Sequence, residues 1–162
     1  MAIMPPRAPV VWTTIAVGSE RFRQRLDARH RELTTQARAR GRAYRRSRGR
    51  ADVDVARMRA DFLAALGRLT AYEAASAGLA RCRFEPQLAA HADDLSRDYF
   101  RLWQLVARRG SEQDLLEERS SERLDYFATQ LGRLEGLADA LTLAGRNVRL
   151  FPLPPMPWAT VA

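Results

Sequence analysis

Arginine is the residue type whose number and placement in this sequence point most clearly to a binding function. All 27 basic residues are arginine, and the formal net charge is +8. Twelve arginines fall between Arg21 and Arg50, where Asp27 and Glu32 are the only acids, so this stretch carries a net charge of +10. Residues 51–162 hold fourteen arginines and sixteen acids. Because a guanidinium group is planar, always charged and able to bind two phosphate oxygens at once, this concentration of charge indicates a polyanionic partner.

The spacing of these arginines would place several of them on one face of a helix. In a helix over residues 19–48, the apolar side chains would form a stripe roughly 60° wide; they are Phe22, Leu26, Leu33, Ala37 and Tyr44. Four arginines would lie on the opposite face, in a row roughly 21 Å long. This arginine row consists of Arg31, Arg38, Arg42 and Arg45. Arg46 and Arg48 extend it, and we predict that all six bind nucleic-acid phosphates.

Other interpretations of the arginines stay open at this point. A GC-rich genome favours arginine codons, and a charged helix face is often simply solvated. Against both, the other helices balance arginine with acid, as in Arg119 and Glu122. No zinc-finger, ribonucleoprotein or KH motif is found, and the pattern does not separate RNA from DNA. Tyr44 could stack on a base, but its place on the apolar stripe favours a core role.

The remaining reactive residue types do not form a catalytic pattern. His30 and His91 have no third ligand at metal spacing. We expect His30 at the surface and His91 half-buried with its hydrogen bonds satisfied. Cys82 is the single cysteine, and its apolar surroundings favour a buried, unreactive thiol. Neither a lysine-containing phosphate loop nor a nucleophile elbow occurs. We therefore predict a protein that is not an enzyme and holds neither a cofactor nor a metal.

Proline placement predicts long helices in the interior of the chain. Seven of the eight prolines lie in the first nine residues or after residue 151, so few positions break a helix. We expect a second helix over residues 52–81. Its buried face would be formed by Val55, Met58, Phe62, Leu66 and Leu69.

Two further helices follow. The third begins at Glu85-Pro86 and ends at Gly110, and the fourth is capped by Ser111 and ends at Gly145. In both, apolar residues recur at spacings of three and four, which is typical of a bundle. The expected fold is all-α, an antiparallel helical bundle of four to five helices.

The two ends of the chain are apolar and rich in proline. This composition divides the sequence into an extended N-terminal tail (residues 1–18), a helical bundle (19–147) and a proline-rich C-terminal tail (148–162). Disordered tails are normally polar, so both tails are expected to pack on the bundle or dock onto a neighbouring subunit. The apolar run of residues 9–17 is too short for a membrane span and lacks a signal-peptide layout, so we expect a cytoplasmic protein.

In size, helix content and basic surface, the chain resembles the small helical subunits of CRISPR effector ribonucleoproteins. The resemblance implies antiviral defence, several copies per complex, neighbouring protein subunits and strand contacts by the arginine row without sequence readout. The expected function is a non-catalytic subunit that binds the RNA or DNA backbone. The alternative is a protein-assembly adaptor of a secretion, phage or coiled-coil scaffold, whose basic helix binds an acidic protein. Membrane docking is disfavoured because the apolar stripe is narrow.

Overall fold

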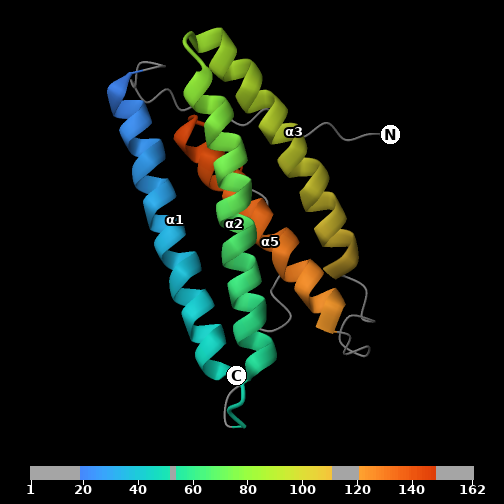
Figure 1. Ribbon diagram of the computed structural model, residues 1–162. Coiled ribbons are helices and arrows are strands. Elements are labelled where there is room, and N and C mark those ends of the chain that lie inside the picture. Colours follow the sequence, from blue (N-terminus) through green and yellow to red (C-terminus); the bar gives the residue numbers. More distant parts are fainter. Residues whose placement is uncertain (1–18, 52–53, 111–120, 149–162) are drawn as a thin grey trace.

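The described part of the chain is built from helices alone. The computed structural model describes residues 19–51, 54–110 and 121–148, and these form four helices and no strand. The helices are α1 (Glu20–Ser47), α2 (Val55–Arg81), α3 (Glu85–Gly110) and α5 (Ser121–Leu143). Successive described helices run in opposite directions, so α2 and α5 run in the same direction, and they cross at an angle (Figure 1). The predicted all-α bundle is confirmed.

Several expectations fall outside the described residues. They concern the predicted cap at Ser111, the start of the second helix at residues 52–53, and the tails at residues 1–18 and 149–162. The described helices number four, and a fifth stays a prediction.

The helix ends follow the local sequence signals. The Ser19 hydroxyl accepts a hydrogen bond from the Phe22 amide at 3.2 Å and so caps α1. Asp54 caps α2 in the same way, through the Arg57 amide at 3.0 Å. At the end of α5, Gly145 has a φ of 80°. The Arg146 amide there donates to the Leu141 carbonyl at 2.8 Å, the pairing that closes a helix with glycine in the left-handed region. The predicted stop at Gly145 is therefore confirmed.

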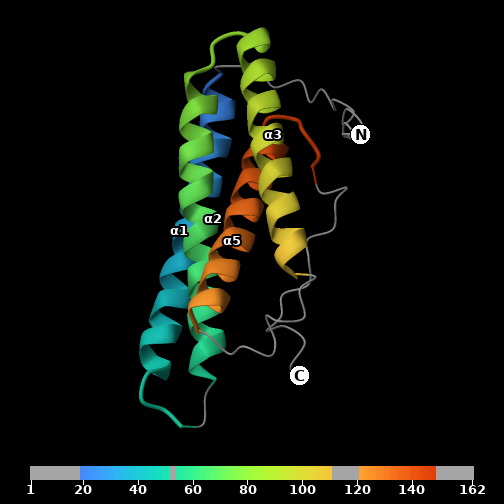
Figure 2. The ribbon, with the colours of Figure 1, turned by 90° about the vertical axis from the view of Figure 1, so that its right-hand side faces the viewer.

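α2 is the central helix, and it packs most closely against α5. A Cβ atom added at Gly132 would overlap the Ala64 carbonyl oxygen, and one at Gly136 would overlap the Arg68 carbonyl oxygen. On the opposite side of the contact, a Cβ at Gly67 would lie 2.5 Å from the Thr129 carbonyl oxygen. These glycines let the two backbones approach directly. α1 packs on a different face of α2 from the one that meets α5, and α3 packs chiefly on α5 (Figure 2).

The predicted buried face of α2 is wrong. The structure buries a face of mostly small residues instead: Ala60, Gly67, Ala71, Tyr72, Ala75 and Leu79. Leu66, expected in the core, is 42% exposed. The physical reason is that α2 lies between two helices, and the closest backbone contact excludes large side chains. Phe62 and Leu69 lie at its flanks and are only partly buried.

The apolar stripes predicted for the other three helices are confirmed. α1 buries Phe22, Leu26, Leu33 and Ala37 as predicted. The α3 seam buries Ala92, Leu95, Tyr99 and Val106, and the α5 seam buries Phe127, Leu131, Leu134, Ala138 and Leu141. Each large apolar side chain buried here contributes about 2 kcal/mol to stability relative to its exposed state. Within the described ranges, no helix is both long enough and apolar enough to cross a bilayer.

Candidate nucleic-acid interface

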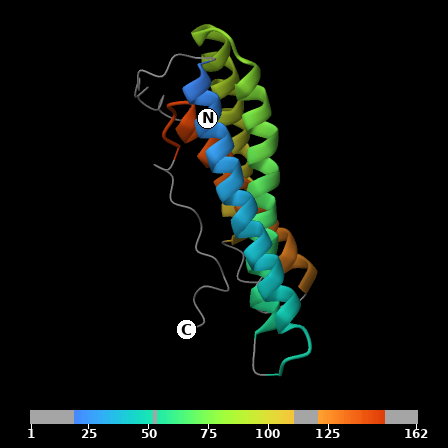
Figure 3. The ribbon, with the colours of Figure 1, turned by 60° about the vertical axis from the view of Figure 1, so that its left-hand side comes forward.

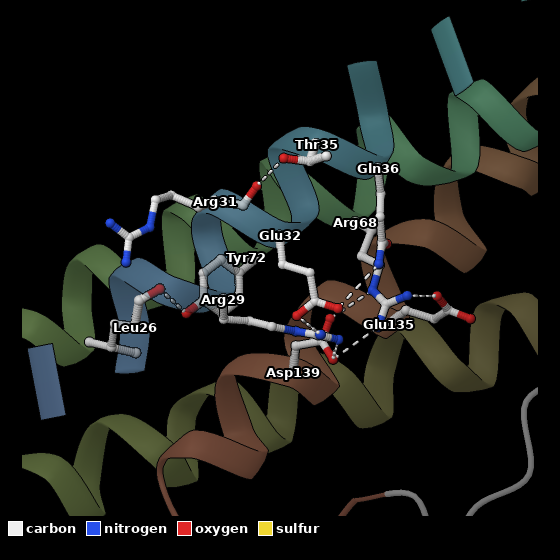
Figure 4. Close-up of polar contacts among 10 residues, drawn as sticks. All are labelled: Leu26, Arg29, Arg31, Glu32, Thr35, Gln36, Arg68, Tyr72, Glu135 and Asp139. Carbon is white, nitrogen blue, oxygen red and sulfur yellow. Dashed lines mark hydrogen bonds and ion pairs between the residues drawn. The ribbon is translucent and has the colours of Figure 1, made fainter. Parts of the chain in front are cut away.

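α1 is held to the bundle by a partly buried group of charges. The Asp139 carboxylate of α5, whose side chain is 3% exposed, accepts hydrogen bonds from Arg29 of α1 at 2.8 Å and from Nε of Arg68 of α2 at 2.7 Å. Glu135 pairs with Arg68 at 3.0 Å, and Glu32 pairs with Arg29 at 2.5 Å. Figure 4 shows these five side chains converging from three helices. We call them the ionic cluster; it fixes the position of α1 along α2 and α5.

The cluster keeps its two arginines charged. Burial lowers the pKa of Arg68, but the hydrogen bonds and negative charge of Asp139 outweigh that effect, and the pKa is raised. The same balance raises the pKa of Arg29, where burial is opposed by Glu32 and Asp139. Both guanidinium groups are therefore structural cations whose charge is already compensated.

A buried tyrosine adds a neutral hydrogen bond beside the cluster. The Tyr72 hydroxyl donates to the Leu26 carbonyl at 2.8 Å, and the tyrosine is fully buried. Burial raises the pKa of this phenol, and the nearby Asp139 charge raises it further. Tyr72 therefore stays protonated and ties α2 to the N-terminal part of α1.

The arginine row lies on the outer face of α1. All four of its members and the adjoining Arg46 and Arg48 are exposed. Figure 3 shows α1 along the outside of the bundle, with its outer face uncovered by the other described helices. In Figure 4 the Arg31 side chain points away from the ionic cluster, although Arg29 points into it. The structure thus leaves all six predicted site arginines exposed, five of them on α1 and Arg48 at its C-cap.

No carboxylate of the described residues pairs with the six predicted site arginines. Among the described residues, the ion pairs of α1 involve other side chains: Arg29 in the cluster, His30 with Glu73 at 2.8 Å, and Arg40 with Asp61 at 3.9 Å. Arg45 and Arg46 stand in the last turn of α1, where the negative end of the helix dipole favours cations. The guanidinium groups of the row are consequently available to an external anion. Arg21, Arg23 and Arg25, which we did not predict as site residues, are exposed on the first turns as well.

Close packing between α1 and α2 turns the end of the row outward. A Cβ atom at Gly41 would lie 2.9 Å from Cε2 of Phe62, so glycine lets the α1 backbone rest on that ring. The next turn stacks Tyr44 on Phe62 with ring centroids 6.1 Å apart and an 18° angle between planes. With Gly41 and Tyr44 facing α2, Arg42 and Arg45 face solvent. The core role predicted for Tyr44 is supported by this contact.

The histidines and the cysteine are not part of this surface. His30 is half-buried and bonded to Glu73 rather than fully solvated. His91 is half-buried as expected, but the expectation that its hydrogen bonds are satisfied is wrong: its buried Nε2 atom has no partner among the described residues, because the ring packs against Gly78. Cys82 is buried, and burial raises the pKa of its thiol. Over the described ranges, no group of three or more histidine, cysteine or acidic side chains could hold a metal ion.

The ionic cluster is the feature that sequence reasoning missed. A signal for it exists: Glu135 and Asp139 stand four residues apart in a mostly apolar stretch of α5, and so share a helix face. Arg68 likewise interrupts the apolar segment of α2. A charge within an apolar stripe needs a partner, but the sequence alone does not say which of the 27 arginines supplies it.

Comparison of the chain with protein-family models, with curated proteins and with solved structures found no match.

Proposed function

We propose that the protein is a non-catalytic helical subunit that binds the backbone of nucleic acid through the arginine row of α1, together with Arg46 and Arg48. The observation that carries the proposal is the contrast on one helix between compensated and uncompensated guanidinium groups. Ion pairs to α2 and α5 engage Arg29 and Arg40, whereas the outward row has no carboxylate partner among the described residues. Repulsion along such a row is relieved when phosphates bind it.

The row is long enough to contact several successive phosphates of a nucleic-acid backbone. From Arg31 to Arg45 it extends roughly 21 Å along a continuous helix, since each residue adds about 1.5 Å. Arginine can bind a phosphate through two parallel hydrogen bonds, which adds geometry to charge. Contacts of this kind hold the ligand without reading its bases.

A place within a larger ribonucleoprotein, of the kind formed by CRISPR effector subunits, is the second part of the proposal. Its support is compositional: residues 1–18 and 148–162 are apolar and proline-rich, as expected of segments that contact neighbouring subunits. Several copies of the chain and other protein subunits would be the partners.

The test is a salt titration of binding by fluorescence anisotropy, with labelled DNA and RNA. The wild type is compared with a variant in which Arg31, Arg38, Arg42 and Arg45 are changed to Glu. If four phosphates are bound, wild-type affinity falls about a hundredfold between roughly 50 and 200 mM salt, because the logarithm of affinity falls by about 0.9 per contact for each logarithmic unit of salt. The variant should lose this binding while its circular dichroism stays helical.

A matched control separates the row from net charge. Arg81, Arg83, Arg97 and Arg101 are exposed at the end of α2, in the connection to α3 and on α3, and changing these four to Glu alters the net charge by the same amount. The control should keep most of the affinity. Equal weakening by both variants would show that binding is diffuse, and undiminished binding by the row variant would favour the adaptor alternative with an acidic protein partner.

A further inference from the structure

The surface around the arginine row contains small side chains rather than rings. Ala28, Thr35 and Ala39 are exposed beside the row on the outer side of α1. The Thr35 hydroxyl is bonded to the Arg31 carbonyl at 2.9 Å, so it faces its own helix (Figure 4). This strip offers no ring on which a base could stack, and the exposed carboxylate of Asp27 lies one turn before Arg31 on the same side.

Both aromatic residues of α1 face inward. Phe22 is 3% exposed and belongs to the core, and the Tyr44 ring is stacked on Phe62. Proteins that bind single strands without sequence preference combine basic grooves with exposed aromatic rings on which the bases stack. The described surface of α1 offers the charge without the rings.

A duplex suits such a surface better than a single strand does. In a duplex the bases are already stacked on one another, and the phosphates present about one negative charge per 1.7 Å of axis. A row roughly 21 Å long then runs beside a duplex segment that carries on the order of twelve charges, some of which face the row. Counterion release per contact is also larger for a duplex, with a coefficient of about 0.9 against about 0.7.

We infer that the ligand of the arginine row is double-stranded nucleic acid, bound through its phosphates without base readout. This inference depends on the proposed function, and it names the class of nucleic acid. Duplex DNA and duplex RNA share the phosphate chemistry, so both are included in the test.

The experiment measures the affinity of the full chain for labelled duplexes of about 20 base pairs, in DNA and in RNA, and for their separated strands. At about 0.1 M salt the duplex should bind about sixfold more tightly than either strand, taking equal affinities at about 1 M salt, because the two salt coefficients differ by about 0.2 for each of four contacts. A duplex of scrambled sequence should bind within about twofold of the first.

The outcomes separate the two claims. Single strands that bind as tightly as the duplex, with binding still lost on reversal of the row, would overturn the inference and leave the proposed function intact. Wild-type protein that binds neither form, or a row variant that binds the duplex like the wild type, would overturn the proposed function itself. A second variant, with the four row arginines changed to Gln, guards against misfolding of the Glu variant and should lose the same duplex preference.

Discussion

Arg29 and Arg31 stand two residues apart on α1, yet their guanidinium groups have opposite environments. Arg29 reaches across the interface to Asp139 of α5, pairs with Glu32 on its own helix, and has a side chain that is 24% exposed. Arg31 points to the outside with the rest of the row (Figure 4). The same residue type is thus structural on the face that meets α5 and free for binding on the opposite face. The positions of the carboxylates on the other helices therefore decide which arginines remain available to bind an external anion.

The largest change in stability is expected when the buried carboxylate that pairs with Arg29 loses its charge. Changing Asp139→Asn leaves Arg29 and Arg68 facing each other without a full counter-charge, and should lower the free energy of unfolding by about 3 kcal/mol. Urea denaturation followed by circular dichroism measures it. Asp94→Asn is the control, since Asp94 forms an exposed pair with Arg97 and should cost less than about 0.5 kcal/mol. Equal effects of the two changes would mean that the ionic cluster does not stabilise the fold.

The close contact that positions Asp139 should be nearly as sensitive. In an ordinary helix position Gly→Ala would stabilise by about 1 kcal/mol. At Gly132 the new methyl group would overlap the Ala64 carbonyl oxygen, so α5 must move from α2, and stability should fall by about 2 kcal/mol. The reverse change at an exposed site of α1, Ala39→Gly, should cost only about 1 kcal/mol. A Gly132→Ala variant with a raised melting temperature would contradict the packing.

Single substitutions of Arg29 and Arg31 should differ in their effect on stability. Arg29→Gln removes the hydrogen bond to the buried carboxylate and should cost about 1.5 kcal/mol. Arg31→Gln should leave stability within about 0.5 kcal/mol of the wild type, or increase it by relieving repulsion along the row. Thermal unfolding of both variants at low and high salt makes the comparison. A destabilisation by Arg31→Gln as large as that by Arg29→Gln would indicate an unrecognised structural role for the row.

The smallest change in stability is expected from Tyr72 at alkaline pH. The pKa of Tyr72 is raised in the folded state, first by burial, and the unfolded chain releases this proton near pH 10. The unfolded state therefore gains stability above about pH 10 while folded Tyr72 stays protonated, so the stability is complete below that pH and is lost as the pH rises. In the Tyr72→Phe variant, the free energy of unfolding should fall less steeply with pH, by up to about 1.4 kcal/mol per pH unit. Identical slopes from pH 9 to pH 11 in urea titrations would contradict this role.

The helices and the outward row could be predicted because they depend on local periodicity. The Ser19 cap, the apolar stripe of α1 and the seams of α3 and α5 all follow from spacing along one helix. The exposure of Arg31, Arg38, Arg42 and Arg45 follows from the same stripe, because the opposite side of a helix with one narrow apolar face is solvent-facing unless another element covers it.

The contacts between helices could not be predicted in the same way. The buried face of α2 was misassigned because large apolar residues such as Leu66 normally mark a core. Here Gly67 of α2 lies against the Thr129 backbone, Gly132 and Gly136 of α5 lie against the α2 backbone, and small residues carry little periodic signal. The pairing of Arg29 with Asp139 joins residues 110 positions apart, and no local rule selects one arginine from twelve.

Arginine-selective modification with phenylglyoxal, followed for each residue by mass spectrometry, tests whether α1 carries both kinds of arginine. Some of its guanidinium groups should be paired with carboxylates, and the neighbouring ones should be open to a ligand. In the free protein the four arginines of the row should react quickly, while Arg29 and Arg68 react slowly. Added duplex should protect the row and leave Arg81 and Arg83 as reactive as before. Fast modification of Arg29, or a row that duplex protects no better than Arg81 and Arg83, would contradict the account.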